Sequence, residues 1–330
     1  MKILGISNPA YVGVRIATQA ICSQYIPAAE CTATAAISAK SEHLATAIME
    51  ACPDVLIVGG WCKWYRHLLE RLKYARNFPV VCVGHGGPYH GKHFTDDLRE
   101  RDVQHCLRYG LADWAAYVDP RVALYCQSVL RRLVLFLPHA VEPRPRVAQA
   151  EGFNVGLFGN AGFHKNTEGP AAIIRDYLAR NPPGELKQCQ GLHRSQREIL
   201  GMIRACSVLV HVSHLEAYPN VVQEAWSMGI PVILSSACSG LARSPLLATE
   251  DREHLCALML NDNIDASELY RALVTVREKW QVYSNEVYAS YGRLSEHSRT
   301  YAASLLQRIV RGHRGHTYDL MFLCLEAPSV

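Results

Sequence analysis

The stretch Cys206–Ser239 reads CSVLVHVSHLEAYPNVVQEAWSMGIPVILSSACS and decides the fold of the chain. It opens with an apolar, β-branched run over 208–212, which is typical of a strand buried on both faces. A helix starts within Pro219-Asn220, because proline fits a first helical turn and asparagine can cap one. Gly229 ends that helix and a second apolar run follows over 232–234. This order of strand, loop, helix, turn and strand predicts a parallel α/β layer.

Two carboxylates flank the start of this helix. Glu216 lies in the loop after the first strand, and Glu224 lies eight residues later, inside the helix. The start of a helix presents free N–H groups and a partial positive charge, which attract anions. In open α/β sheets, ligands lie beyond the carboxyl ends of the strands. We therefore expect one site that holds a phosphate at the helix start and sugar hydroxyls at the two carboxylates.

The run EAYPNVVQEAWSMGIPVI over 216–233 closely resembles the Glu-x7-Glu signature of family-4 retaining glycosyltransferases, which have the GT-B fold. The glutamate spacing, the Pro-Asn and Glu-Ala pairs and the Gly-x-Pro-Val run all agree. The resemblance implies that Glu216 approaches the donor sugar and that Glu224 holds the ribose of the nucleotide. It also places four neighbours at the donor: Ala217, Tyr218, Pro219 and Asn220. The alternative is an ordinary strand–helix–strand unit with one surface and one helical glutamate.

The composition is that of an ordinary globular protein. A chain of 330 residues can bury a sizeable core in two domains, and 19% charged residues with a net charge of +4 do not by themselves indicate a nucleic-acid partner. No apolar run approaches the ~20 residues of a membrane helix, and we expect no signal peptide. Twelve cysteines occur without a C-x-x-C pair. We expect reduced thiols and a cytoplasmic location.

Strand and helix patterns alternate along the first half of the chain, which predicts a doubly wound parallel sheet. Strands are expected at 2–6, 32–37, 55–58, 80–83 and 134–137. Helices are expected at 14–24, 43–52, 64–76 and 96–108. The loop after the first strand resembles the glycine-bearing first loop of GT-B enzymes, which approaches the donor phosphate or the acceptor. Gly13 and Arg15 are its candidates, and a plain turn is the alternative.

A second series of strands and helices begins at Asn154. Strands are expected at 155–158 and 185–190, and helices at 169–180, 195–206, 251–260, 266–280 and 283–311. The loop from Gly159 resembles the Gly-Arg-…-Lys loop in which a basic pair holds the donor diphosphate. Lys165 has the expected spacing, but Asn160 replaces the arginine and leaves half of that clamp in doubt. His164, or a basic residue of the other domain, is the alternative cation.

We therefore predict a GT-B protein with two Rossmann-like, doubly wound domains facing a cleft. Residues 1–143 would form the acceptor domain, 144–153 a proline-rich linker, and 154–312 the nucleotide-sugar donor domain. In GT-B proteins the final helix crosses back onto the N-terminal domain. The resemblance implies the same here, with the tail 313–330 packing there.

A glycine-rich loop after the strand 80–83 carries His85, His90 and His93. Three interpretations stay open: a flexible polar loop, a set of metal ligands that would need a further carboxylate or cysteine, or a histidine beside the sugar and acceptor. The last follows from the resemblance and selects His85. With it, the expected catalytic residues are Glu216, His85 and Lys165.

The segment Trp61–His67 interleaves aromatic and basic residues. Such a patch could stack bases and neutralise phosphates, grip a sugar ring, or form an amphipathic helix whose aromatics enter the core. As acceptor-binding candidates we take Arg15 and four residues of this segment: Trp61, Lys63, Trp64 and Arg66.

The resemblance implies a metal-independent, retaining glycosyltransferase without a cofactor. It would move a sugar from a UDP- or GDP-sugar to a hydroxyl of a glycan or lipid-linked sugar. A hydroxymethylated base in DNA is an alternative acceptor, suggested by the aromatic and basic segment. A nucleotide-sugar epimerase and a non-catalytic binding module are alternatives of the same fold.

Overall fold

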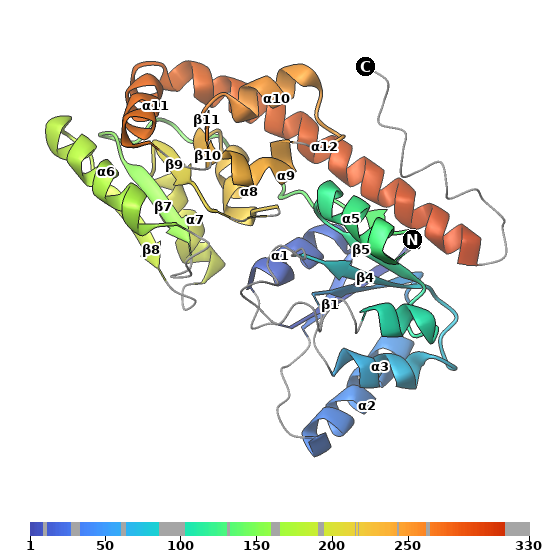
Figure 1. Ribbon diagram of the computed structural model, residues 1–330. Coiled ribbons are helices and arrows are strands. Elements are labelled where there is room, and N and C mark those ends of the chain that lie inside the picture. Colours follow the sequence, from blue (N-terminus) through green and yellow to red (C-terminus); the bar gives the residue numbers. More distant parts are fainter. Residues whose placement is uncertain are drawn as a thin grey trace. The chain divides into compact units, whose positions relative to one another are not determined.

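The structure is a computed structural model that describes residues 1–8, 12–27, 34–60, 64–85, 103–130, 133–159, 166–190, 195–214, 216, 218–242, 244–261 and 265–313. Contacts divide this part of the chain into two compact units (Figure 1). The first unit contains Met1–Ala140 and residues 298–313, and the second contains Val141–His297. Each unit has a parallel sheet with helices packed on it, so the predicted α/β class is confirmed.

The sheet of the first unit has the strand order β2-β1-β3-β4-β5-β6, and all its pairs are parallel. Its strands are β1 (Ile3–Ser7), β2 (Gln24–Pro27), β3 (Val55–Gly59), β4 (Val80–Gly84), β5 (Trp114–Tyr117) and β6 (Leu135–Phe136). The helices whose bounds lie in the described part are α1 (Val12–Ile21), α2 (Thr34–Ala51), α3 (Tyr65–Leu72) and α5 (Pro120–Leu130).

The strand expected at 32–37 is wrong, because residues 34–37 belong to helix α2. The second strand of the sheet is β2, which lies earlier in the chain. The segment TAAISA at the start of α2 contains three alanines, and alanine is the best helix former. The isoleucine and threonine that suggested a strand are outweighed by these neighbours.

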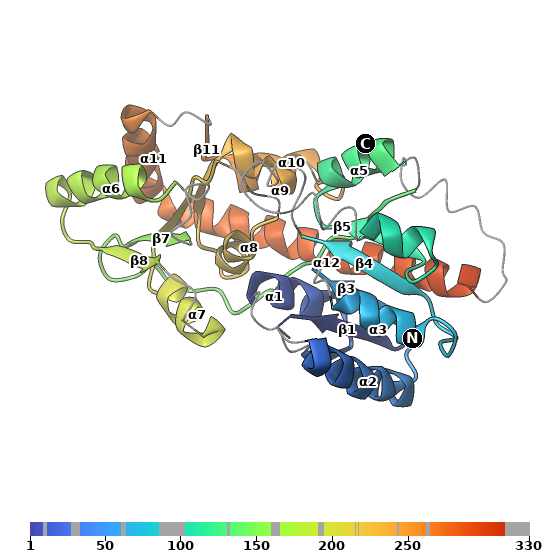
Figure 2. The same ribbon diagram turned by 60° about the horizontal axis from the view of Figure 1, so that its bottom comes forward.

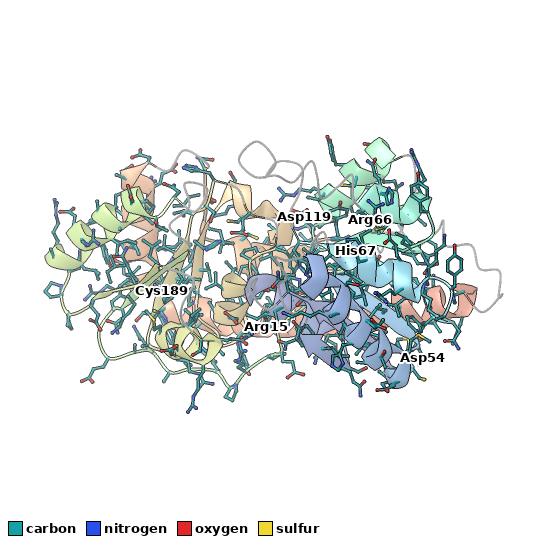
Figure 3. All side chains as sticks on the ribbon, turned by 90° about the horizontal axis from the view of Figure 1, so that it is seen from below. Arg15, Asp54, Arg66, His67, Asp119 and Cys189 are labelled. Carbon is teal, nitrogen blue, oxygen red and sulfur yellow. The ribbon has the colours of Figure 1, made fainter. Side chains whose placement is uncertain are left out.

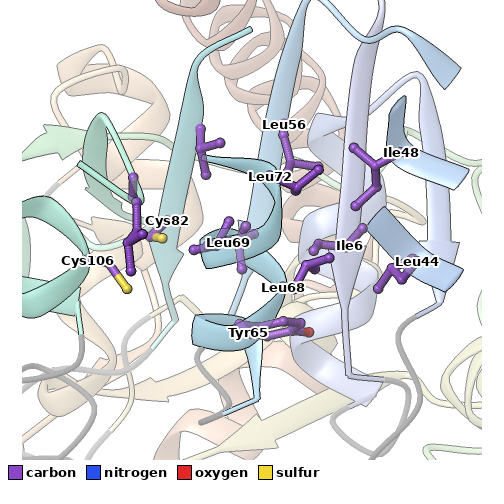
Figure 4. Close-up of a cluster of buried hydrophobic side chains, with 14 of the residues drawn as sticks. Ile6, Leu44, Ile48, Leu56, Tyr65, Leu68, Leu69, Leu72, Cys82 and Cys106 are labelled. Atoms are coloured by element: carbon purple, nitrogen blue, oxygen red, sulfur yellow. The ribbon is translucent and has the colours of Figure 1, made fainter. Parts of the chain in front are cut away.

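One face of this sheet is covered by α2 and α3. Leu68, Leu69 and Leu72 project from α3 into a buried cluster that also contains Ile6 and Leu56 from the strands (Figure 4). Spacings of three and four residues place these leucines on one side of the helix, which explains why α3 forms with so short a length. Burying such side chains contributes roughly 1.5–3 kcal/mol each.

Helix α1 packs on the opposite face of the sheet. Its Thr18 lies against Gly5 and Gly59, whose neighbours in the strands face the cluster under α2 and α3. The helix approaches β3 so closely that a Cβ atom at Gly59 would lie 1.8 Å from Oγ1 of Thr18. Gly60 follows with a φ of +62°, in the left-handed region that favours glycine. The Gly59-Gly60 pair is therefore required by the close contact between strand and helix.

The sheet of the second unit has the order β11-β10-β9-β7-β8 and is also parallel. Its strands are β7 (Val155–Gly159), β8 (Leu186–Gln190), β9 (Val208–His211), β10 (Val232–Ser235) and β11 (Met259–Leu260). Its helices are α6 (Glu168–Arg180), α7 (Gln196–Arg204), α8 (Asn220–Trp226), α9 (Ser239–Ala242), α10 (Thr249–Cys256) and α11 (Ala266–Glu278). Figure 2 shows α6 and α7 on opposite sides of this sheet.

The expected helix over 251–260 ends early. Helix α10 stops at Cys256, and Met259 and Leu260 form the edge strand β11 instead. The stretch of Cys206–Ser239 has the predicted order, with β9, α8 and β10 in sequence. Gly229 has a φ of +74°, and the N–H of Ile230 returns to the carbonyl of Ala225, 3.0 Å away, which closes α8.

The segment expected as a linker is hydrogen-bonded to the second unit. The Arg144 N–H donates to the carbonyl of Ser227 and the Val147 N–H to that of Met228. The last helix, α12 (Trp280–His313), is continuous and contributes residues to both units (Figure 2). The tail beyond residue 313 lies outside the described residues.

Candidate active site

Glu216 lies in the loop that follows β9. Its Oε2 atom is 3.3 Å from Nε2 of His211, the last residue of the strand. The two side chains are 14% and 3% exposed, so this ion pair is largely removed from water. A loop carboxylate is thereby tied to a strand at the carboxyl edge of the sheet.

The base of this loop is fixed by two further hydrogen bonds. The Ser235 hydroxyl, from β10, donates to the carbonyl of Ser213 at 2.6 Å. The side-chain amide of Asn166 donates to the carbonyl of Val212 at 3.2 Å. Asn166 ends the loop that begins at Gly159, so the two loops that the sequence assigns to the donor meet here.

The charge of His211 follows from its neighbours. Burial disfavours the protonated ring, but the charge and hydrogen bonding of the adjacent Cys238 sulfur and of the Glu216 carboxylate outweigh it and raise the pKa of His211 to about 9. The imidazole is therefore a cation at neutral pH. A charge-assisted hydrogen bond to Glu216 follows from that state.

Glu224 lies inside α8 and is 3% exposed. Its Oε1 atom accepts a hydrogen bond of 3.2 Å from the side-chain amide of Gln196, at the start of α7. Burial raises the pKa of Glu224, while the Gln196 hydrogen bond and the Arg144 charge oppose the shift. This carboxyl is thus a buried acceptor with a polar partner and a nearby cation.

A cavity of about 480 Å³ lies beside this pair in the second unit. Arg144, Arg197 and Arg204 line it together with Gln196, Leu200 and Gly201. Arg197 and Arg204 are seven residues apart on α7, two turns along one face of the helix. The cavity is therefore positively charged.

The other expected donor residues divide into two groups. Tyr218 and Pro219 are buried and Asn220 is half-buried at the start of α8, while Gly159 ends β7 next to β9 in the sheet. Asn160, Lys165 and Ala217 lie outside the described residues. Helix α8 has seven residues, so its dipole is short.

In the first unit, His85 directly follows β4. Its Nε2 atom is buried and has no hydrogen-bond partner among the described residues. The ring of His139 lies 6.2 Å away between centroids. Burial, and then the neighbouring His139, lower the pKa of His85 to about 3, so this imidazole is neutral. The rest of the histidine loop, with His90 and His93, lies outside the described residues.

The expected acceptor residues of the first unit are spread over two helices. Arg15 lies on α1 and Arg66 on α3 (Figure 3); Gly13, which was expected at the donor, also lies on α1. Arg66 pairs with Glu70 and lines a cavity of about 400 Å³. Trp64 is 5% exposed and packs in the core against Tyr65, with 4.6 Å between ring centroids. Trp61 and Lys63 lie outside the described residues.

Sequence reasoning missed His211 and Gln196. A histidine in the otherwise apolar run 208–212 is a signal that could have found the first, because a buried imidazole needs partners. Gln196 contacts Glu224 across 28 positions of the chain, and nothing in the local pattern predicts that contact.

In the described ranges, no group of three or more His, Cys, Asp or Glu side chains could hold a metal ion. No helix in the same ranges has the length and apolar character needed to cross a membrane. The nine cysteines that the structure describes are free thiols.

No protein-family model and no curated protein sequence matches this chain. Solved structures do match over nearly the whole chain. HepE from Anabaena, in complex with UDP and glucose, has a TM-score of 0.61 at 12% identity and covers 96% of this chain and 100% of its own. The lipopolysaccharide outer core galactosyltransferase WaaB, in its apo form, has a TM-score of 0.55 at 14% identity, covering 92% of this chain and 99% of its own.

Sucrose-phosphate synthase from Thermosynechococcus elongatus has a TM-score of 0.55 at 13% identity, and the likeness covers 94% of this chain and 97% of that protein. These structures have the GT-B fold. Two parallel, doubly wound sheets over the same extent of chain lead to one conclusion: this protein has the GT-B fold.

Proposed function

We propose that this protein is a retaining glycosyltransferase that transfers a sugar from a nucleoside diphosphate to an acceptor hydroxyl. The observation that carries the proposal is a pair of carboxylates held by hydrogen bonds, one in the loop after β9 and one on the helix α8 that follows it. The two glutamates are eight residues apart in the chain. Glu216 is hydrogen-bonded to His211, and Glu224 is hydrogen-bonded to Gln196. Carboxylates are acceptors for hydroxyl groups, which a sugar and a ribose both present.

In this proposal the second unit binds the donor. Glu216 orients the sugar ring, Glu224 accepts hydrogen bonds from the ribose, and Lys165 stabilises the diphosphate that leaves. The arginine-lined cavity beside Gln196 adds positive charge close to the nucleotide, which suits an anionic donor. UDP is the first nucleotide to test, because the HepE structure holds UDP and glucose. We assign no protein base.

In the same proposal the first unit binds the acceptor, a glycan or lipid-linked sugar. His85 is neutral, and a neutral imidazole can both donate and accept a hydrogen bond at a hydroxyl. The DNA alternative loses one of its two aromatic rings, since Trp64 is buried in the core and cannot stack on a base.

The test is a panel of UDP- and GDP-sugars offered with oligosaccharide, lipid-linked sugar and hydroxymethylated DNA, with and without EDTA. Mass spectrometry detects the product and NMR gives its anomeric configuration. We expect a product with retained configuration, formed equally well in EDTA. The variant Glu224→Ala should bind UDP more weakly, while Glu253→Ala, which removes an exposed carboxylate of α10, serves as its control.

Three results would contradict the proposal. Inverted products would exclude retention. Interconversion of epimeric sugar nucleotides without any acceptor would indicate an epimerase. Binding of nucleotide sugars with no release of diphosphate, under any acceptor of the panel, would indicate a binding module.

A further inference from the structure

We infer that His211 is a positioning residue for the donor sugar, because it holds the Glu216 carboxylate in one orientation. The inference rests on the function proposed above, in which Glu216 contacts the sugar. His211 acts through Glu216, since its own side chain is 3% exposed and lies against protein groups.

The strand that carries His211 is a rigid base for such a contact. β9 lies between β10 and β7 in the sheet, and His211 itself is paired in register with Leu234 of β10. Its other residues, Val208, Leu209 and Val210, are fully buried. A side chain projecting from a central strand is more precisely placed than one on a loop. Glu216 is on a loop, and its contact with His211 ties it to this strand.

The contact acts on a part of the loop that lies beyond its base. Ser235 and Asn166 hold the backbone at Ser213 and Val212, at the base of the loop. Glu216 lies three residues beyond Ser213, and its carboxylate is the group that meets the imidazole. The Ser213 hydroxyl lies 3.4 Å from the same Nε2 atom, so the ring also joins the loop base to the carboxylate.

A histidine would be an unfavourable residue at position 211 if its only role were to fill the core. Burial of an imidazole carries a desolvation penalty, and an aliphatic side chain in a strand such as Val208–His211 carries none. The titratable groups that face the ring are Glu216 on the loop and Cys238, which follows β10. Charge therefore adds to the hydrogen bond, and a carboxylate held in this way cannot rotate freely when a sugar binds.

The experiment compares His211→Leu, which removes the contact, with His211→Gln, whose amide nitrogen reaches the place of Nε2. The probes are UDP, measured by calorimetry, and UDP-glucose or the sugar nucleotide that the donor panel selects, measured by diphosphate release. We expect His211→Leu to lower kcat/KM roughly 10- to 100-fold, because a small misplacement at a reacting centre has effects of this size. The Kd for UDP should not change, and His211→Gln should restore most of the turnover.

A double-mutant cycle with Glu216→Gln shows whether His211 acts through the carboxylate. The double variant should be no slower than Glu216→Gln alone. His254→Leu is the matched control, because it removes another histidine of the same unit, one that is hydrogen-bonded to Ser290. This variant should leave both the Kd for UDP and the rate of diphosphate release unchanged.

A structural role would give other results. If His211→Leu weakened UDP binding as much as turnover, or if its effect multiplied with that of Glu216→Gln, the inference would be wrong. Normal turnover in Glu216→Gln would instead refute the role proposed for Glu216 itself. Should His211→Leu not fold, His211→Gln and His211→Asn decide, since only the longer amide reaches Glu216 and only it should keep activity.

Discussion

His85 and His211 each lie at the carboxyl end of a parallel strand, one in each sheet, and the two rings differ in charge. His85 follows β4 in the first unit and has a pKa of about 3, whereas His211 ends β9 in the second and has a pKa of about 9. Burial lowers the pKa of both rings. The difference is that Glu216 and Cys238 face His211, while the neighbour that acts on His85 is another histidine, His139.

Position in the fold therefore does not set the chemistry of such a residue. The same side chain, at the same kind of strand end, is a fixed cation in one unit and a neutral ring in the other. A fixed cation is suited to holding a carboxylate, and a neutral ring to exchanging hydrogen bonds with a hydroxyl. This difference matches the donor and acceptor roles that we propose for the two units.

The largest expected effect is on the stability contributed by His211. Its pKa is higher in the folded chain than the ordinary value of 6.5, so its contribution is fully present below pH 6.5 and is lost as the pH rises to about 9. His211→Leu should remove a difference of about 3 kcal/mol in the free energy of unfolding between these limits. Urea denaturation of both proteins at pH 6 and pH 9.5 measures it. If the free energy of unfolding changed with pH in the same way in the wild type and the variant, the ion pair would be disproved.

A second effect separates the two units by their affinity for nucleotide. Glu224→Ala should weaken UDP binding roughly 10- to 100-fold, which corresponds to the loss of hydrogen bonds to a charged group. His85→Ala should leave UDP binding unaltered, because the donor is assigned to the other unit. Calorimetry with UDP tests both variants, and equal losses in the two would remove the distinction between donor and acceptor units.

The smallest expected effect is on the stability contributed by His85, and its pH dependence should have the opposite sign to that of His211. Below pH 6.5 an unfolded chain protonates His85, but the folded chain does not until about pH 3, so stability falls as the pH is lowered. His85→Phe should reduce this fall by about 1–2 kcal/mol at pH 5. Urea denaturation at pH 6.5 and pH 5 provides the measurement. A variant that loses stability as steeply as the wild type would show that His85 is protonated in the folded state.

Much of the fold could be predicted from the sequence, because buried parallel strands and their helices follow local patterns. The order β9, α8, β10 rests on Pro219, Gly229 and two apolar runs, all of which act locally. The segment 34–37 and the edge strand β11 were predicted incorrectly. In one, alanines outweighed β-branched neighbours; in the other, a two-residue strand is too short to have a pattern of its own.

The candidate site could be predicted only in part. Glu216 and Glu224 share one motif, so their spacing is visible along the chain. Their partners are visible to different degrees: His211 is five residues from Glu216, but Gln196 is on another helix. The charge states of His85 and His211 could not be predicted from the sequence, because the pKa of a histidine depends on burial and on neighbours that the fold brings together.

The continuous helix α12 gives the first unit an ending that is synthesised long after its beginning. Tyr301, on the last part of α12, packs against Phe136 with 5.9 Å between ring centroids. Roughly 160 residues separate Ala140 from Ser298, where this unit resumes in α12. A ribosome that adds about 5–20 residues per second needs on the order of 8–30 s to make them. The first sheet therefore emerges without its final covering, and completes its folding only after the whole second unit has been made.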